Sequence, residues 1–256
     1  MEIFKEYAPY YDLMYMDKNY TAEVDYVHSL ISAYAPQAKT VFDGGCGTGG
    51  HSLLLAEKGF EVLGVDLSAA MIQRANEKKS QAPGANVQFQ QGNLIDFVPK
   101  KKFDVALLLF HVFGYLQDQN SINQALLNIK NFLVDDGLLI LDFWSEEAVK
   151  AKPIDTRTKT ATNAFYKVYR ISEASFDYTK QQADVSFTFF VENLKKNQIE
   201  KFTEFHSMRF YQAQALASLL KAYGFEVLLC QELLTGKEPS ENTFSLCLVA
   251  RKKPGN

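Results

Sequence analysis

The chain has 256 residues, of which 47% are apolar and 22% charged, as expected for one large α/β domain or one domain with an insertion. A net charge of -3 excludes a broadly basic surface for nucleic acid, so we expect a small-molecule ligand. Cys46, Cys230 and Cys247 are too few and too scattered for a disulfide framework, and no Cys/His cluster indicates a metal site.

The N-terminal sequence MEIFKEYAPYYD is acidic and aromatic, whereas a signal peptide would be basic and then apolar. The longest apolar run, Val105 to Phe110, is too short to cross a bilayer. Together with the cysteine usage, these features predict a reduced, cytoplasmic protein that is neither exported nor embedded in a membrane.

From Thr40 to Trp144, apolar runs alternate with amphipathic segments, which is typical of βα units and a parallel sheet. Ser68 can cap one helix, and apolar residues recur with the helical period over residues 122–133, which predicts another. A turn at residues 135–137 is expected to end this second helix. The predicted strands are residues 40–43, 61–66, 87–90, 103–110 and 138–143.

The pattern changes after Trp144. Residues 145–163 are polar and aperiodic, which predicts a mobile connection or a lid. Three runs rich in Phe and Tyr then alternate apolar and polar residues, which predicts a small antiparallel sheet made of residues 166–172, 183–192 and 200–211. The chain closes with a helix and two strands, at residues 212–225, 226–234 and 243–252. Because no helix separates these two strands, we expect them to pair antiparallel, which disfavours a six-stranded parallel dinucleotide fold.

The stretch TVFDGGCGTGGHSL, residues 40–53, reads as a strand, a glycine turn and a helix. Its glycines fit both the dinucleotide pattern G-x-G-x-x-G and the D-x-G-x-G-x-G turn of enzymes that bind S-adenosylmethionine. Asp43, at the end of the strand, would repel a pyrophosphate but attract the amino group of a methionine moiety. S-adenosylmethionine is therefore the favoured cofactor, and an NAD-linked oxidoreductase is the alternative.

Asp66 ends the next strand, where a carboxylate can accept hydrogen bonds from both ribose hydroxyls of either cofactor. Asn93, after the third strand, is a candidate partner for the adenine edge. Leu67, Met71 and Leu94 are candidates for the apolar walls around the ring, although each could equally be an ordinary core residue.

These motifs resemble class I S-adenosylmethionine-dependent methyltransferases over nearly the whole chain. The turn DGGCGTGG, the acidic end of the second strand, GNLIDF and the reversed last strand carry this resemblance. The stretches YYDLMYMDKNYTAEV, LLFHVFGYLQ, LDFWSEE and EFHSMRFY are similar, more specifically, to the N,N-dimethyltransferases of nucleotide-linked amino sugars in macrolide pathways. The resemblance implies a Rossmann-like α/β fold, with a seven-stranded mixed sheet whose last strand is antiparallel and a small antiparallel β insertion.

The resemblance also divides the chain into functional parts. Residues 1–36 would form a helical cap over the cofactor, residues 37–150 and 207–256 the methyltransferase domain, and residues 151–206 a β insertion or substrate lid. The cofactor-binding residues that we predict are Tyr11, Tyr15, Tyr20, Asp43, Gly44, Gly45, Cys46, Gly47, Asp66, Leu67, Met71, Gly92, Asn93, Leu94, Leu109 and Phe110.

The reaction implied is in-line transfer of a methyl group to a small-molecule amine, with an amino sugar as the specific acceptor and S-adenosylhomocysteine as the product. An amine needs only a modest general base, for which Tyr115, His206, His111 and Glu204 are candidates. Tyr115 stands where the macrolide enzymes have a histidine, so a non-catalytic cofactor-binding protein is an alternative, as is O-methylation of another metabolite.

The remaining open points concern the insertion. Its aromatic strands could close a pocket around a compact acceptor or pair two copies of the chain as a homodimer. Lys195 and Lys196, in a hairpin turn, are ordinary solvated charges or weak candidates for contact with a substrate phosphate.

Overall fold

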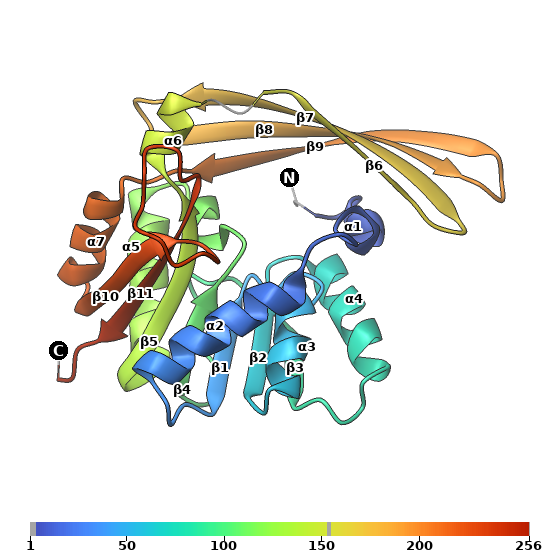
Figure 1. The fold of residues 1–256 in the computed structure, drawn as a ribbon. Coiled ribbons are helices and arrows are strands. Elements are labelled where there is room, and N and C mark those ends of the chain that lie inside the picture. The colour runs from blue at the N-terminus through green and yellow to red at the C-terminus, as the bar shows by residue number, and fades with distance from the viewer. Residues whose placement is uncertain (1–3, 153–154, 256) are drawn as a thin grey trace.

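The computed structural model describes residues 4–152 and 155–255. A seven-stranded sheet with helices on both faces forms the main domain, and a four-stranded sheet lies across its upper edge (Figure 1). In chain order the main sheet contains β1 (Thr40–Gly44), β2 (Glu61–Asp66), β3 (Val87–Gln91), β4 (Phe103–Leu108), β5 (Leu133–Trp144), β10 (Phe225–Glu232) and β11 (Ser245–Lys252). The helices that flank it are α2 (Tyr20–Tyr34), α3 (Gly50–Glu57), α4 (Ala69–Ser80), α5 (Gln119–Phe132) and α7 (Ala213–Ala222).

The strand order of the main sheet is β10-β11-β5-β4-β1-β2-β3. The pairs β1–β2, β1–β4, β2–β3 and β4–β5 are parallel, whereas β11 is antiparallel to both β5 and β10. The mixed seven-stranded sheet with a reversed last strand, predicted from the sequence, is therefore confirmed.

The buried strands carry apolar residues toward both faces, because successive side chains of a strand point to opposite sides. Phe42 of β1 packs in the cluster with α5 and α7, while its neighbour Val41 packs in the cluster with α2, α3 and α4. On α5 the buried residues recur with the helical period that the sequence shows, from Ile122 to Phe132. Burying each such large side chain contributes about 1.5–3 kcal/mol, and both clusters hold the carboxyl ends of the strands in fixed positions.

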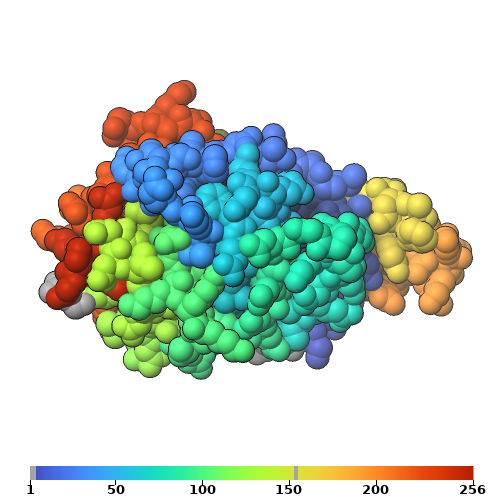
Figure 2. Space-filling view, turned by 90° about the horizontal axis from the view of Figure 1, so that it is seen from below, coloured from blue at the N-terminus to red at the C-terminus, as the bar shows by residue number. Residues whose placement is uncertain are grey.

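The second sheet is a four-stranded antiparallel meander in the order β6-β7-β8-β9. Its strands are β6 (Arg157–Thr162), β7 (Tyr166–Asp177), β8 (Gln182–Asn193) and β9 (Gln198–Arg209). The short helix α1 (Ala8–Met14) lies between the two sheets and buries Tyr11 and Met14 against Val168 and Phe189 of the second sheet. The hairpin ends of the second sheet project beyond the main domain (Figure 2).

The polar stretch over residues 145–163 is more regular than its sequence predicts. It contains α6 (Glu146–Ala151), whose first turn is capped by the Ser145 side chain, and the edge strand β6. Within the stretch, residues 153–154 lie outside the described part. The expectation of an aperiodic connection was wrong for β6, because backbone pairing with β7 stabilises a strand in which Ala161 is the one buried residue, whereas the alternative of a lid stays a prediction.

Several predicted boundaries also differ; the strand expected at 166–172, for example, continues to Asp177 as β7. The strand expected to end at Phe110 ends at Leu108, because Phe110 and His111 both adopt left-handed backbone conformations. β5 begins directly after α5, so the expected turn at 135–137 is instead an irregularity within the strand, where its register with β4 shifts. In the part of the chain that the structure describes, no helix is both long enough and apolar enough to span a bilayer.

Candidate active site

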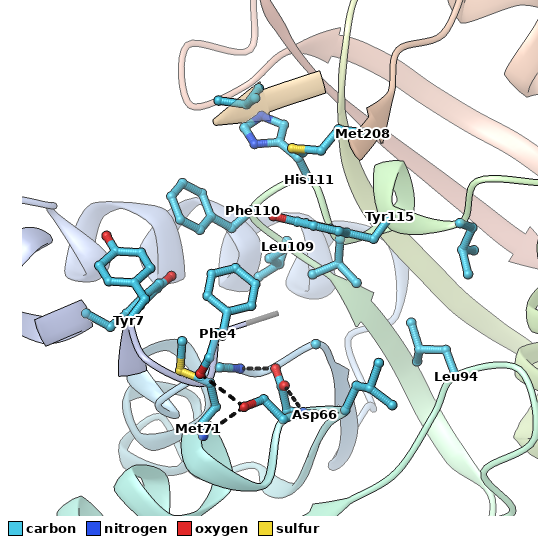
Figure 3. A pocket seen from close by; sticks show the side chains of 18 of the residues that line it. Phe4, Tyr7, Asp66, Met71, Leu94, Leu109, Phe110, His111, Tyr115 and Met208 are labelled. Carbon is cyan, nitrogen blue, oxygen red and sulfur yellow. Dashed lines mark hydrogen bonds between the residues drawn. The ribbon is translucent and has the colours of Figure 1, made fainter. Parts of the chain in front are cut away.

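A cavity of about 570 Å³ opens between the carboxyl ends of the main-sheet strands and the inner face of the second sheet. Ligands of open α/β sheets bind at this end of the strands. In Figure 3, Asp66 and Met71 lie at one side of the cavity and His111 and Tyr115 at another, with Phe4 and Tyr7 between the two groups. The N-terminal segment, the main sheet and the second sheet therefore each contribute a wall.

The glycine turn after β1 brings the main chain to the cavity wall. Gly45 has φ 71°, and a Cβ there would lie 2.4 Å from a methyl group of Val112. Gly47 has φ 54°, and a Cβ there would meet no atom within 4 Å. Both residues line the cavity, so the turn needs glycine at position 45 for packing and leaves the main chain at Gly47 open to close approach by a ligand.

Asp66 is held in a fixed orientation at the end of β2. One carboxylate oxygen accepts the Gly47 N–H at 2.8 Å and the other accepts the Ser68 N–H at 2.8 Å. Burial raises the pKa of Asp66, although the two amide hydrogen bonds act in the opposite direction. Each oxygen keeps a further lone pair, and the residue lines the cavity, so it can accept the two ribose hydroxyls of a nucleoside.

Asp43 does not line the cavity. Its side chain is only 2% exposed and accepts a hydrogen bond from the Ser52 hydroxyl of α3. Burial raises its pKa, although the nearby His51 and the hydrogen bond from Ser52 act in the opposite direction. In the structure Asp43 therefore ties β1 to the helix after the glycine turn, and its contact with a methionine moiety stays a prediction.

Tyr115 and His206 come together from separate parts of the fold. Tyr115 lies in the 3-10 helix η1 (Val112–Tyr115) after β4, and its hydroxyl is 2.9 Å from Nδ1 of His206 on β9. On the other side of the imidazole, Nε2 lies 3.4 Å from a carboxylate oxygen of Glu204, within ion-pair range but outside hydrogen-bond geometry. Glu204 accepts the backbone N–H groups of Phe4 and Tyr7, each at 3.0 Å.

The ionisation of this group follows from its surroundings. Burial raises the pKa of Tyr115, so the phenol stays protonated and donates to His206 Nδ1 in the tautomer that carries its hydrogen on Nε2, the nitrogen that faces Glu204. Burial alone would raise the pKa of Glu204, but contact with His206 and hydrogen bonds from the two amides outweigh burial and lower it. The arrangement is a protonated phenol at the cavity wall, a buried imidazole behind it and an ionised carboxylate beside the imidazole.

His111 also lines the cavity, but it is held differently. Its backbone N–H donates to Asp142 at 2.9 Å, and its Nε2 lies 3.0 Å from the Ser245 hydroxyl. Burial lowers the pKa of His111, which favours a neutral imidazole even though Asp142 lies nearby. Because His111 and Phe110 both have positive φ, these contacts stabilise a strained backbone at the end of β4.

The structure brings most of the predicted residues to one cavity. Those that line it are Tyr11, Tyr15, Gly45, Gly47, Asp66, Leu67, Met71, Gly92, Asn93, Leu94, Leu109, Phe110, His111 and Tyr115. Those that do not are Tyr20, Asp43, Gly44, Cys46, Glu204 and His206. Tyr20 packs against His51 with ring centroids 4.9 Å apart, and His206 lies behind Tyr115.

Sequence reasoning predicted that the inserted strands could close a pocket, but it did not identify the polar residues that they contribute to the cavity. Arg157 of β6 and Arg170 and Ser172 of β7 line it, as do Phe4 and Tyr7 ahead of α1. The alternation of Arg170 and Ser172 shows that their side chains share a face of β7. Which face points into the cavity is decided by how the second sheet lies over the first.

Comparisons with known proteins agree with this geometry. Residues 36–202 match the family described as "Methyltransferase domain". A Geobacillus sp. (strain WCH70) protein assigned as a methyltransferase is 28% identical over 253 residues, 97% of this chain and 99% of its own length. The dTDP-3-amino-3,4,6-trideoxy-alpha-D-glucopyranose N,N-dimethyltransferase of Streptomyces venezuelae is 27% identical over 141 residues, 54% of this chain and 57% of its own length.

The fold has a counterpart among solved structures. The crystal structure of an S-adenosylmethionine-dependent methyltransferase from Clostridium acetobutylicum gives a TM-score of 0.80 at 18% identity, covering 98% of this chain and all of that one. The resemblance to amino-sugar N,N-dimethyltransferases that the sequence indicates is confirmed by the similarity to the Streptomyces venezuelae enzyme.

Proposed function

The chain belongs to the methyltransferase domain family, and on that premise we propose that it methylates an amine nitrogen of a small-molecule acceptor. Family membership makes it an S-adenosylmethionine-dependent methyltransferase and replaces the NAD-linked oxidoreductase as an interpretation of the glycine turn. The nature of the acceptor is our inference, and the Tyr115–His206 hydrogen bond is the observation that carries it.

The cavity fits the cofactor on its own chemistry. Asp66 offers lone pairs for two hydroxyls, and the missing Cβ of Gly47 leaves room for a ligand against the main chain. Met71 and Leu94 add apolar walls near Asp66. S-adenosylmethionine, when bound, supplies a methyl group already activated by its attachment to a positively charged sulfur.

The remaining task of the protein is to align the acceptor and remove one proton. Tyr115 can accept an N–H of the acceptor with a phenol lone pair while its own hydroxyl hydrogen points to His206 Nδ1. Transfer of the acceptor proton to the phenol oxygen and of the phenol proton to Nδ1 leaves Tyr115 neutral. Glu204, ionised and 3.4 Å from Nε2, then stabilises the positive charge on His206.

This relay favours nitrogen over oxygen as the methylated atom. An imidazole can take the proton of an ammonium-like nitrogen, whose acidity is close to its own, far more easily than the proton of an alcohol. Methylation of an acidic hydroxyl is the second candidate, since a phenol of the acceptor could use the same pair.

The test is a turnover assay with purified protein, S-adenosylmethionine carrying a labelled methyl group and matched acceptors. Each pair of acceptors shares one skeleton and differs only in an amine or a hydroxyl at one position, and amino sugars are included. We expect S-adenosylhomocysteine and labelled product from the amines. Product from the hydroxyl members alone would contradict N-methylation, and cofactor binding without product from any acceptor would indicate a non-catalytic protein.

We also propose a cytoplasmic setting and association through the second sheet. The three cysteines are free in the structure, as is usual in a reducing compartment. Ile199 and Phe205 of β9 are 70% and 63% exposed, so the outer face of the second sheet offers apolar surface for a homodimer. A single monomeric species in analytical ultracentrifugation at micromolar concentration would contradict the dimer.

A further inference from the structure

Two arginines and a serine form a polar corner of the cavity on the second sheet. Arg157 of β6 lies opposite Ser172 of β7 in the strand register, and Arg170 lies two residues before Ser172. Residues opposite each other and residues two apart share one face of a sheet, and all three of these residues line the cavity. The corner therefore lies on the wall that the second sheet contributes.

The positive charges of this corner lack acidic partners. Among the described residues, neither Arg157 nor Arg170 lies within ion-pair distance of a carboxylate. Arg170 donates only to the hydroxyls of Tyr7 and Tyr15, each at 3.2 Å, and its Nε is buried with no hydrogen-bond partner. Neutral hydroxyls do not compensate a guanidinium charge, so Arg170, half-buried with its Nε fully covered, is a charged group without a counterion.

Aromatic packing fixes the direction in which Arg170 presents its donors. Its guanidinium carbon lies 4.9 Å from the centre of the Phe187 ring and 5.7 Å from that of Tyr15. The Phe187 ring also contacts His206, with ring centroids 4.9 Å apart. One aromatic ring therefore separates Arg170 from the imidazole that takes part in proton removal.

The charge balance of the cavity gives this corner a function. Within the described lining, Asp66 is the one carboxylate, and it lies on the cofactor side. A cationic cofactor and an amine would enter a space that already faces the half-buried guanidinium of Arg170 and the exposed one of Arg157, and like charges repel one another. An acceptor that carries its own negative group would remove this repulsion.

We propose that Arg170, Arg157 and Ser172 bind an oxyanion of the acceptor, a phosphate or a carboxylate, and thereby hold its amine against Tyr115. The planar donor fork of arginine matches both kinds of oxyanion. The proposal rests on the proposed N-methylation for the position of the amine. The anion site itself can be tested without any methyl transfer.

The experiment is calorimetric titration of the full chain, saturated with S-adenosylhomocysteine, with inorganic phosphate, pyrophosphate and acetate in separate runs. We expect one of these anions to bind. Tighter binding of phosphate than of acetate would indicate a phosphate group on the acceptor, and the reverse order would indicate a carboxylate. Arg170→Gln should weaken that affinity about tenfold or more, and Arg157→Gln by a smaller factor. The anion affinity of Arg170→Lys should fall between those of the wild type and Arg170→Gln, because lysine keeps the positive charge but lacks the planar arrangement of guanidinium N–H donors.

The control is Lys196→Gln, which removes an exposed positive charge from the β8–β9 hairpin, far along the strand from His206. Equal weakening by Lys196→Gln and Arg170→Gln would overturn the proposal, since it would show unspecific attraction to net charge. Absence of anion binding by the wild type would overturn it as well. Thermal unfolding of each variant separates loss of the site from loss of the fold, and Arg157, being exposed, can be changed with little structural cost.

A second binding comparison tests whether Arg170 binds the carboxylate of the cofactor and not an oxyanion of the acceptor. S-adenosylhomocysteine carries a carboxylate, whereas 5′-methylthioadenosine shares its nucleoside and lacks the amino acid. If Arg170→Gln weakened binding of the first compound and left the second unchanged, the carboxylate of the cofactor would be the partner of Arg170 and our proposal would be wrong. If the anion site is confirmed but no amine is methylated, the proposed acceptor chemistry fails by itself.

Discussion

Tyr115→Phe is the substitution that most directly tests the proton-accepting pair. It removes a single oxygen atom and leaves the ring packing in place, but it takes away the hydrogen-bond partner of His206 Nδ1. His206 is 1% exposed, and its Nε2 already lacks a hydrogen bond, so the variant would leave a buried imidazole with neither nitrogen paired.

The cost can be estimated from the desolvation of that nitrogen. Leaving a buried acceptor without a partner costs about 1–3 kcal/mol, and for a domain of this size each kcal/mol lowers the melting temperature by roughly 2–4 °C. If Tyr115 relays the proton, turnover should also fall about a hundredfold or more, within the range of general-base catalysis. The affinity for S-adenosylhomocysteine should stay near that of the wild type.

Tyr211→Phe is the matched control. The Tyr211 hydroxyl is buried with no hydrogen-bond partner, and the residue is 5% exposed. The same chemical change there removes an unsatisfied polar group, so stability should be unchanged or higher. Differential scanning calorimetry and single-turnover kinetics on both variants provide the measurements. Equal melting temperatures for Tyr115→Phe, Tyr211→Phe and the wild type, with turnover preserved, would refute the role of the Tyr115–His206 pair.

Three further outcomes follow from the geometry of the cavity. Asp66→Asn should weaken S-adenosylhomocysteine binding about tenfold or more in calorimetry. The reason is that the single amide oxygen cannot accept hydrogen bonds from both backbone N–H groups and from the ribose hydroxyls as well. An unchanged affinity would show that the ribose binds elsewhere. In chemical denaturation, Gly45→Ala should cost about 2 kcal/mol or more through its clash with Val112, whereas Gly47→Ala should cost only the left-handed penalty of about 1–2 kcal/mol. Equal losses for the two glycine variants would contradict the tight packing of Gly45 against Val112. Since burial lowers the pKa of His111 from its ordinary 6.5, the unfolded chain takes up a proton there before the folded chain does, so stability should fall as pH falls through this value. His111→Asn, which tolerates the positive φ, should lose this part of the pH dependence in urea titrations, and an identical slope for variant and wild type would count against a neutral His111.

The main sheet shows how much local pattern can predict. The strand at residues 61–66 has the predicted bounds, and α5 buries the residues that recur with the helical period. These elements are set by hydrophobic periodicity, which is a local property of the chain. The strand β6 escaped prediction because its sequence RTKTAT offers Ala161 as its one apolar residue, and an edge strand is held by backbone hydrogen bonds that no side-chain pattern records.

Which side chains reach the cavity depended on the tertiary structure and not on the local sequence pattern. Asp43 ends β1 as the sequence shows, yet its side chain turns to Ser52 of α3 and away from the cavity. The charge argument that places Asp43 beside the methionine moiety stays a prediction, and the assignment of S-adenosylmethionine rests on family membership and on the fit of the cavity.

By itself the sequence determined the class of fold, the glycine turn and the position of Asp66, because each depends on residues that are neighbours along the chain. Only the tertiary structure joined Tyr115 to His206, which are 91 residues apart, and turned Arg170 toward the cavity. A sequence pattern shows which side chains share a face of a strand. The packing of one sheet over another decides what that face meets, and this packing is the summed result of many weak apolar contacts between distant segments.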